Sequence, residues 1–191
     1  AKNIKDICKK RKILLIADEI QSGIGRTGKI FAYKHYGVSP DIITSAKGLG
    51  SGIPIGATIV KKKIAKKISI GFHGSTFGGG MLQTRVAYGV FNTINKKSFL
   101  NKVSKNGDLL SKLLNKLKSN NENIIKEVRS KGLMAAIEFK NNKIALNIYN
   151  KIGKDGLVTT LIQGNTIRIT PPLIISALEL KKGLEIISKN L

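Results

Sequence analysis

The sequence is poor in aromatic residues, in cysteine and in acidic residues. Aromatic residues make up 5% of the 191 residues, tryptophan is absent, and the single Cys8 cannot form a disulfide within the chain. Basic residues outnumber acidic residues by 34 to 11, which gives a formal net charge of +23. An excess of this kind is common in proteins that bind nucleic acids or anionic membranes.

The kind of basic residue argues against a nucleic-acid partner. Only five of the 34 basic residues are arginine, whereas proteins that recognise bases and phosphates depend strongly on the planar guanidinium group. The basic clusters at residues 9–12 and 61–63 contain no aromatic residue that could stack on a base. We therefore interpret the net positive charge as compositional drift and the local lysine clusters as solvated surface.

The sequence also lacks the patterns of a membrane protein and of a metal site. No apolar run has the length of about 20 residues that a transmembrane helix needs, and no apolar signal core follows Lys2 and Lys5. The only histidines, His35 and His73, have no cysteine or carboxylate nearby at the spacing of metal ligands. We expect a cytoplasmic protein with no membrane contact and no metal.

Two short apolar runs end beside residues that can carry chemistry. Residues 13–17 precede Asp18 and residues 41–45 lead to Lys47, and both runs have the composition of buried strands. The connection between them is long enough for a parallel crossover, so both strands would end at the same edge of a sheet. A lysine that forms an imine and a carboxylate that holds a proton on a pyridine nitrogen must approach a flat heterocycle from opposite sides, so they need to come from different strands whose ends converge on one crevice.

The remaining pattern predicts an α/β protein with two parts. A polar interruption near Lys97 separates residues 1–97 from residues 98–191. In the first part we expect helices over residues 2–11 and 80–95, a short helix or turn over 62–67 and a strand over 56–60. The helix over 80–95 would bury Leu82, Val86, Val90 and Ile94.

The second part shows three helical patterns separated by strands. The apolar helical stripes are formed by Leu109, Leu110, Leu113, Leu114 and Leu117, and by Ile144, Ile148 and Ile152. The predicted strands are residues 124–129, 133–139, 157–160 and 166–170. Ser176 and Glu179 have the spacing of a capping box at the start of the last helix.

Four sequence motifs distributed over the chain are similar to one enzyme family. They are Asp-Glu-Ile-Gln-Ser-Gly-Ile-Gly-Arg-Thr-Gly at 18–28, Ala-Lys-Gly-Leu-Gly at 46–50, His-Gly-Ser-Thr-Phe-Gly-Gly at 73–79 and Ile-Arg-Ile-Thr-Pro-Pro-Leu at 167–173. The chain resembles the class III pyridoxal-phosphate aminotransferases over its whole length, and within them the acetylornithine aminotransferases. The resemblance implies the type I fold of pyridoxal-phosphate transferases. Residues 1–97 would form the second half of the large mixed-sheet domain and residues 98–191 the carboxyl-terminal α+β small domain.

The resemblance also assigns roles toward the cofactor, pyridoxal 5'-phosphate. Lys47 would form the resting imine and later transfer the α-proton as base and acid. Asp18 would keep the ring nitrogen protonated. Ile20, on the same side of an extended segment as Asp18, would cover one face of the ring, and Gln21 would donate a hydrogen bond to the phenolic oxygen. Thr76 would bind the cofactor phosphate in the neighbouring subunit of a homodimer.

Two further residues are expected to contact the substrate. Ser75 would lie beside it, and Arg168 would bind its α-carboxylate through two parallel hydrogen bonds. A structural ion pair with a nearby glutamate is the other interpretation of an arginine in an apolar strand. One departure from the family pattern follows the phosphate motif, where Gly80 and Met81 replace the usual asparagine and proline.

The resemblance implies an aminotransferase that moves an amino group between N-acetylornithine, or a similar ω-amino acid, and 2-oxoglutarate in arginine biosynthesis. Ornithine, succinyl-diaminopimelate and 4-aminobutyrate are alternative substrates, because the resemblance implies that most of the residues expected to read the distal end of the substrate would belong to a first half of the enzyme, upstream of these residues. A noncatalytic basic fragment that binds anionic partners is the alternative of another class. The joint presence of Asp18, Lys47, Thr76 and Arg168 argues against it.

Overall fold

The computed structural model describes residues 2–191 and divides into two compact units, Ala1–Leu100 and Asn101–Leu191. The border lies inside one helix, α4 (Lys97–Ser119), which begins at the point where the sequence pattern predicted a domain change. The polar interruption marks the short break between α3 (Met81–Ile94) and α4. The backbone is therefore helical across the border between the units.

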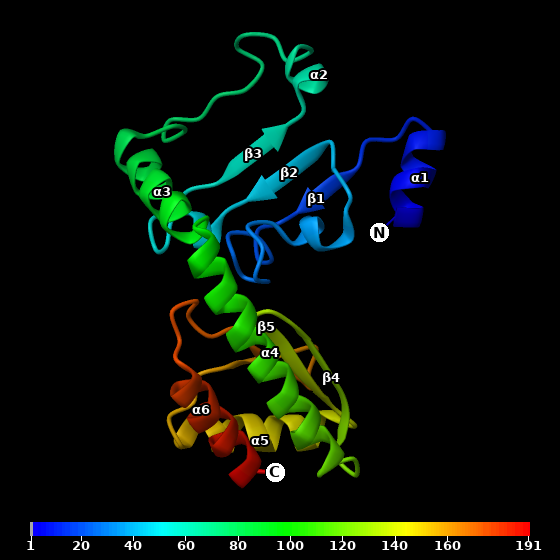
Figure 1. Cartoon of the computed structure of the whole chain (residues 1–191), viewed down its shortest axis with the longest axis vertical. Helices are drawn as coiled ribbons and strands as arrows, with labels where there is room; N and C mark the ends of the chain where they lie inside the picture. Colours follow the sequence, from blue (N-terminus) through cyan, green and yellow to red (C-terminus); the bar gives the residue numbers. More distant parts are fainter. Residues whose placement is uncertain (1) are drawn as a thin grey trace. The chain divides into compact units, whose positions relative to one another are not determined.

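The first unit is built on a mixed three-stranded sheet (Figure 1). Its strands are β1 (Ile16–Asp18), β2 (Ile42–Ser45) and β3 (Ala57–Val60), in the order β1-β2-β3. The pair β1–β2 is parallel, as the long connection predicted, and β2–β3 is antiparallel. The other elements are α1 (Lys2–Lys10), α2 (Lys62–Ala65), α3 and the 3₁₀ helices η1 (Ala32–Tyr36) and η2 (Lys47–Leu49).

Asp41 determines where the ladder between β1 and β2 begins. Its Oδ2 accepts a hydrogen bond from Leu15 N at 3.1 Å, and its Oδ1 lies 3.1 Å from Lys61 Nζ and 3.2 Å from Lys63 Nζ. The Leu15 hydrogen bond and the two lysines lower the pKa of Asp41 to about 2. Because Leu15 N is bound to a side chain, regular strand pairing begins only at Ile16, later than predicted.

The burial predicted for α3 is partly wrong. Ile94 is buried and Val86 and Val90 are half-buried, but Leu82 is 66% exposed. Each step of four residues rotates a helical position by about 40°, so Leu82 lies about 120° around the helix from Ile94. The predicted apolar stripe therefore rotates away from the buried face toward the first turn of the helix, which leaves Leu82 exposed.

The second unit is an antiparallel sheet covered by helices. The strands β4 (Ile125–Lys131), β5 (Met134–Phe139), β6 (Thr160–Ile162) and β7 (Thr166–Ile169) lie in the order β4-β5-β7-β6. The helices α4, α5 (Asn142–Lys154) and α6 (Ala177–Lys189) supply the other half of the core. Its buried apolar side chains include Val103, Leu110, Leu114, Ile137, Phe139, Ile148, Ile152, Ile167, Leu184 and Ile187.

In this unit the start of α6 was predicted correctly from its capping residues, whereas β6 begins later in the chain than predicted. The capping box of α6 is present, with Glu179 N donating to Ser176 Oγ and Ser176 N donating to Glu179 Oε2. The strand expected over 157–160 is β6, which begins only at Thr160. Leu157 N still donates to Ile152 O at 2.9 Å, so the chain there completes the end of α5.

Among residues 2–191, no helix combines the length and apolar character that crossing a membrane would require.

The start of α3 has the backbone geometry that favours asparagine at position 80 and proline at position 81, the two residues that are usual in the family pattern. Gly80 is the N-cap, with φ −51° and ψ 135°, and makes no side-chain cap hydrogen bond; Met81 is the first helical residue. Asparagine is among the best N-cap residues, and proline is favoured at the next position because its fixed φ is already helical. The substitutions found in this chain therefore cost stability and leave the helix start in place.

Restoring both residues, Gly80→Asn with Met81→Pro, should raise the free energy of unfolding by about 0.5–1 kcal/mol, through the cap and the lower entropy of the unfolded chain. A Cβ at residue 80 would lie 2.3 Å from Gln83 Oε1, but this is the end of a flexible side chain that can rotate away. Thermal unfolding would measure the change, with Met81→Leu as a neutral control. A lower Tm for the double variant would show that α3 does not begin at Met81.

Candidate functional site

Asp18 and the turn that contains Lys47 lie at the same end of the first sheet, where the strands β1 and β2 finish. Asp18 is the last residue of β1 and pairs with Thr44, and Lys47 follows the end of β2 at Ser45 by two residues. Because β1 and β2 are parallel, both chains leave the sheet in the same direction. Both Asp18 and Lys47 are exposed to solvent. The structure thus brings together the acid and the lysine that the sequence singled out.

The Asp18 carboxylate is held from one side only. Its Oδ1 accepts hydrogen bonds from Ile20 N at 3.1 Å and from Thr44 Oγ1 at 3.0 Å. Its Oδ2 accepts no hydrogen bond from the part of the chain that the structure describes. The sequence did not indicate Thr44 as a site residue, because its contact with Asp18 depends on the register of the two strands. The carboxylate is fixed in direction and keeps one oxygen for a partner such as a protonated pyridine nitrogen.

Lys47 has a strained backbone. Its φ is 45°, in the left-handed region that residues with a side chain rarely adopt. Such a conformation costs about 1–2 kcal/mol. The turn around Lys47 is closed by Leu49 N, which donates to Ala46 O at 3.0 Å, and by Gly50 N, which donates to Lys47 O at 3.1 Å. Strain that the surrounding structure enforces is frequent at functional sites.

The extended segment expected from Asp18 to Ile20 is absent. The strand ends at Asp18, the chain turns at Ile20, and Ile20 N binds the Asp18 carboxylate. The alternation of an extended strand therefore does not place Ile20 and Asp18 on one side. Ile20 is half-buried in this turn and Gln21 is exposed.

Glu19 is a buried carboxylate that the sequence analysis missed. It is 3% exposed, and its oxygens accept hydrogen bonds from Ser22 Oγ at 2.7 Å, Ala32 N at 3.0 Å and Tyr33 N at 2.8 Å. Burial and the charge of Glu19 raise the pKa of Tyr33. An acidic residue directly after Asp18 was the only signal in the sequence, and it does not distinguish a solvated side chain from a buried one.

Ser75 and Thr76 lie in a different place. Both are exposed in the connection between α2 and α3. This connection follows β3, which is the edge strand on the opposite side of the sheet from the edge strand β1 (Figure 1). The structure therefore does not bring Ser75 and Thr76 next to Asp18 of the same chain.

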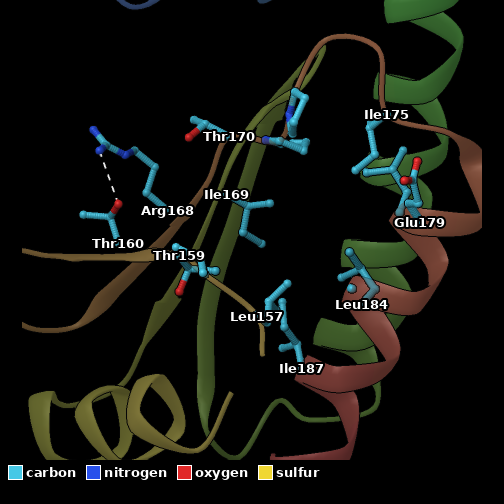
Figure 2. A pocket seen from close by; sticks show the side chains of 15 residues that line it. Leu157, Thr159, Thr160, Arg168, Ile169, Thr170, Ile175, Glu179, Leu184 and Ile187 are labelled. Atoms are coloured by element: carbon cyan, nitrogen blue, oxygen red, sulfur yellow. Dashed lines mark hydrogen bonds between the residues drawn. The ribbon is translucent and has the colours of Figure 1, made fainter. Parts of the chain in front are cut away.

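Arg168 belongs to the second unit. It lies in β7 opposite Ala136 of β5 and Thr160 of β6, and its Nη2 is 3.5 Å from Thr160 Oγ1. Figure 2 shows the guanidinium directed toward Thr160 and away from Leu184 and Ile187. Those aliphatic side chains belong to α6 and line an apolar pocket of about 330 Å³.

The glutamate nearest to Arg168 in the sheet register has basic partners of its own. Glu138 lies on β5 two residues from Ala136, so both are on the same face of the sheet. Its carboxylate binds Lys126 Nζ at 2.7 Å and Arg129 Nη1 at 2.6 Å, and these bonds lower its pKa to about 2. Glu138 therefore forms its ion pairs with Lys126 and Arg129.

No group of three or more histidine, cysteine, aspartate or glutamate residues within 2–191 is arranged to hold a metal ion.

Comparison with known proteins decides the family. The family described as Aminotransferase class-III matches residues 1–191. This chain belongs to the class III aminotransferases. The acetylornithine/succinyldiaminopimelate aminotransferase of Photorhabdus laumondii is 41% identical over 184 residues, which are 95% of this chain and 45% of that protein.

Solved structures of aminotransferases share the fold. The acetylornithine aminotransferase of Elizabethkingia anophelis has a TM-score of 0.92 and 36% identity, over 99% of this chain and 48% of its own. An ornithine aminotransferase of Toxoplasma gondii, described with partial occupancy of pyridoxal phosphate (PLP) at its active site, has a TM-score of 0.92 and 30% identity, over 99% of this chain and 45% of its own. The chain spans about half the length of these relatives.

The close contact of Gly23 with Glu19 gives a test of the loop geometry. A Cβ on Gly23 would lie 2.6 Å from Glu19 O and 3.3 Å from the Phe31 ring, so Gly23→Ala should lower the free energy of unfolding by about 1–3 kcal/mol. Gly89→Ala, in α3 with no atom within 4 Å of its new Cβ, should instead raise it by about 0.5–1 kcal/mol. Urea unfolding of both variants measures the difference. Equal stability of the two would show that the loop is more open than described.

Proposed function

We propose that this chain carries the cofactor lysine of a PLP-dependent aminotransferase that moves an amino group between an ω-amino acid such as N-acetylornithine and 2-oxoglutarate. The observation that supports this function is the placement of Asp18, at the end of β1, and Lys47, two residues after the end of the adjacent parallel strand β2, at the same end of the sheet. The fit to the cofactor is supported by the open Oδ2 of Asp18, the acceptor that a protonated pyridine nitrogen needs.

Four residues of the first unit have separate proposed roles toward the cofactor. PLP, when bound, withdraws electrons from the substrate amino acid, so that its α-proton can be removed. Asp18 would stabilise the positive charge on the ring nitrogen, Ile20 would cover one ring face and Gln21 would donate to the phenolic oxygen. Lys47 Nζ would hold the cofactor, and it would serve as the base that takes the substrate α-proton and as the acid that returns it.

Arg168 is proposed to bind the α-carboxylate of the substrate. Its Nη2 lies 3.5 Å from Thr160 Oγ1, so the Thr160 hydroxyl helps to orient the guanidinium. A planar guanidinium binds a carboxylate through two parallel hydrogen bonds. The same contact would serve the amino donor and 2-oxoglutarate, since both carry a carboxylate on the reacting carbon.

The exposed connection before α3 supports a homodimer with shared sites. Ile70, Phe72 and Phe77 are 106%, 76% and 83% exposed, and they flank Ser75 and Thr76. An exposed apolar segment of this kind is typical of a protein interface. We propose that a second copy of the protein covers it, so that Thr76 binds the cofactor phosphate and Ser75 contacts the substrate in the partner's site.

The substrate is proposed from the names of the relatives. Acetylornithine and succinyldiaminopimelate occur in the name of the Photorhabdus protein, and ornithine in that of the Toxoplasma protein. N-acetylornithine is our first choice, which would place the enzyme in arginine biosynthesis. Kinetics with each of the three donors would rank them.

Borohydride reduction of the protein incubated with PLP should attach the cofactor to Lys47. The visible absorbance band should disappear, and peptide mass spectrometry should locate the label. Lys47→Ala should abolish turnover, because no other residue is proposed to transfer the α-proton, whereas the control Lys62→Ala, on the exposed helix α2, should remain active. Label on another lysine would contradict the assignment, and a protein that binds no PLP would favour the noncatalytic alternative.

Replacement of Arg168 by lysine should weaken both half-reactions by about 2–4 kcal/mol in transition-state binding, because lysine keeps the charge and loses the paired hydrogen bonds. The bound-cofactor absorbance should be unchanged. The control is Arg129→Lys, which alters the ion-paired arginine of the same sheet and should leave both half-reactions near the wild-type rate. If Arg168→Lys changed neither half-reaction, Arg168 would be a structural residue.

A further inference from the structure

We propose that the Glu19 carboxylate is a positioning residue for Lys47, acting through the loop of residues 20–33 and the side chain of Ile24. The inference rests on the proposed function of Lys47 and adds a residue to it. Glu19 does not touch the cofactor in this proposal. It holds the turn from which Lys47 reaches the cofactor in a single conformation.

The carboxylate joins the two ends of the loop. Ser22 Oγ, near the beginning of the loop, and Ala32 N and Tyr33 N, at its end, all donate to Glu19. The amides of Ala32 and Tyr33 are the first two of η1. Without Glu19, these two N–H groups would lack an acceptor. Hydrogen bonds to a buried carboxylate are stronger than those between neutral groups. Removing the charge would therefore loosen both ends together.

The closed loop forces Ile24 into an unfavourable conformation. Ile24 has a φ of 50° and is 2% exposed. A β-branched residue in the left-handed region is an outlier that only its surroundings can maintain. Those surroundings are the hydrogen bonds of the two flanking glycines, from Gly23 N to Glu19 O at 3.0 Å and from Gly25 N to Ile30 O at 3.3 Å.

The side chain of Ile24 bounds the space beside Gly48, the residue that follows Lys47. A Cβ placed on Gly48 would be 3.5 Å from Ile24 Cβ and 3.7 Å from its Cγ2, so a single added carbon atom would fill the gap between them. The turn can therefore move only a short way toward the loop before it meets Ile24. Lys47 itself has the left-handed φ of 45°. Two strained residues, Ile24 and Lys47, thus lie on neighbouring segments.

Glu19 is also tied to the strand that leads to Lys47. Its N–H donates to Thr44 O at 2.9 Å, next to the pairing of Asp18 with Thr44. The backbone of Glu19 therefore holds β2, while its side chain holds the loop whose Ile24 borders Gly48. Glu19 is thus connected to the Lys47 turn through Thr44, which precedes Lys47 in the chain, and through the loop beside Gly48, which follows it.

Hydrogen exchange of the cofactor-free protein, expressed from its complete reading frame, tests the connection directly. Glu19→Gln keeps the shape of the side chain but replaces an acceptor oxygen by a donor. The amides of Leu49 and Gly50, which close the Lys47 turn, should then exchange at least about 10-fold faster. Asp41→Asn is the matched control, because it removes a hydrogen-bonded carboxylate from the opposite end of β2. It should change those amides by less than about 2-fold.

Titration with PLP, followed by absorbance, tests the route through Ile24. Glu19→Gln and Ile24→Ala should each raise the Kd about 10-fold, and the double variant about 10- to 20-fold instead of about 100-fold, because both remove the same support. Ile24→Val keeps the β-branch beside Gly48 and should bind close to wild type. Should Glu19→Gln fail to fold, Ser22→Ala removes only one donor and should show a smaller change in the same direction.

Three results would overturn the proposal. Exchange of Leu49 and Gly50 that stays at the wild-type rate in Glu19→Gln or Ser22→Ala would disconnect Glu19 from the turn. Multiplicative losses in the double variant would show that Glu19 does not act through Ile24. Equal effects of Asp41→Asn and Glu19→Gln would reduce Glu19 to general stability. Absence of PLP binding in the wild type would instead reject the proposed function, and the exchange measurement would still decide the role of Glu19.

Discussion

The parallel pairing of β1 with β2 is the constraint on which the candidate site depends. It places Asp18 opposite Thr44 and directs both chains out of the same edge of the sheet. An antiparallel pair would send one of the two loops to the far edge. The hydrogen bond from Thr44 Oγ1 to Asp18 Oδ1 then turns the strand register into a fixed direction for the carboxylate.

A second constraint is the conformational strain near this edge. Ile24 and Lys47 both have left-handed backbones, which local preference disfavours. The contacts that compensate are a buried carboxylate, two glycine turns and van der Waals packing, all within the first unit. Placing strain beside the reactive lysine and compensating for it in the loop is a common arrangement in active sites.

The scarcity of acidic residues makes each structured carboxylate important. Against 34 basic residues there are 11 acids, and five of these acids accept two or more hydrogen bonds or ion pairs: Asp18, Glu19, Asp41, Glu138 and Glu179. Asp41 organises the beginning of the β1–β2 ladder, and Glu138 gathers Lys126 and Arg129 on the second sheet. The excess of lysine is compatible with this fold because most of the lysine side chains are solvated.

The sequence by itself determined the type and order of most elements, because hydrophobic period and capping residues are local. It predicted the α6 capping box at Ser176 and the strands that lead to Asp18 and Lys47. The tertiary structure alone decided the contact of Thr44 with Asp18, the burial of Glu19, the exposure of Leu82 and the late start of β6. Each of these depends on strand register or on which side chains approach from distant parts of the chain. Local composition does not contain that information, so a buried Glu19 and a solvated one have the same sequence.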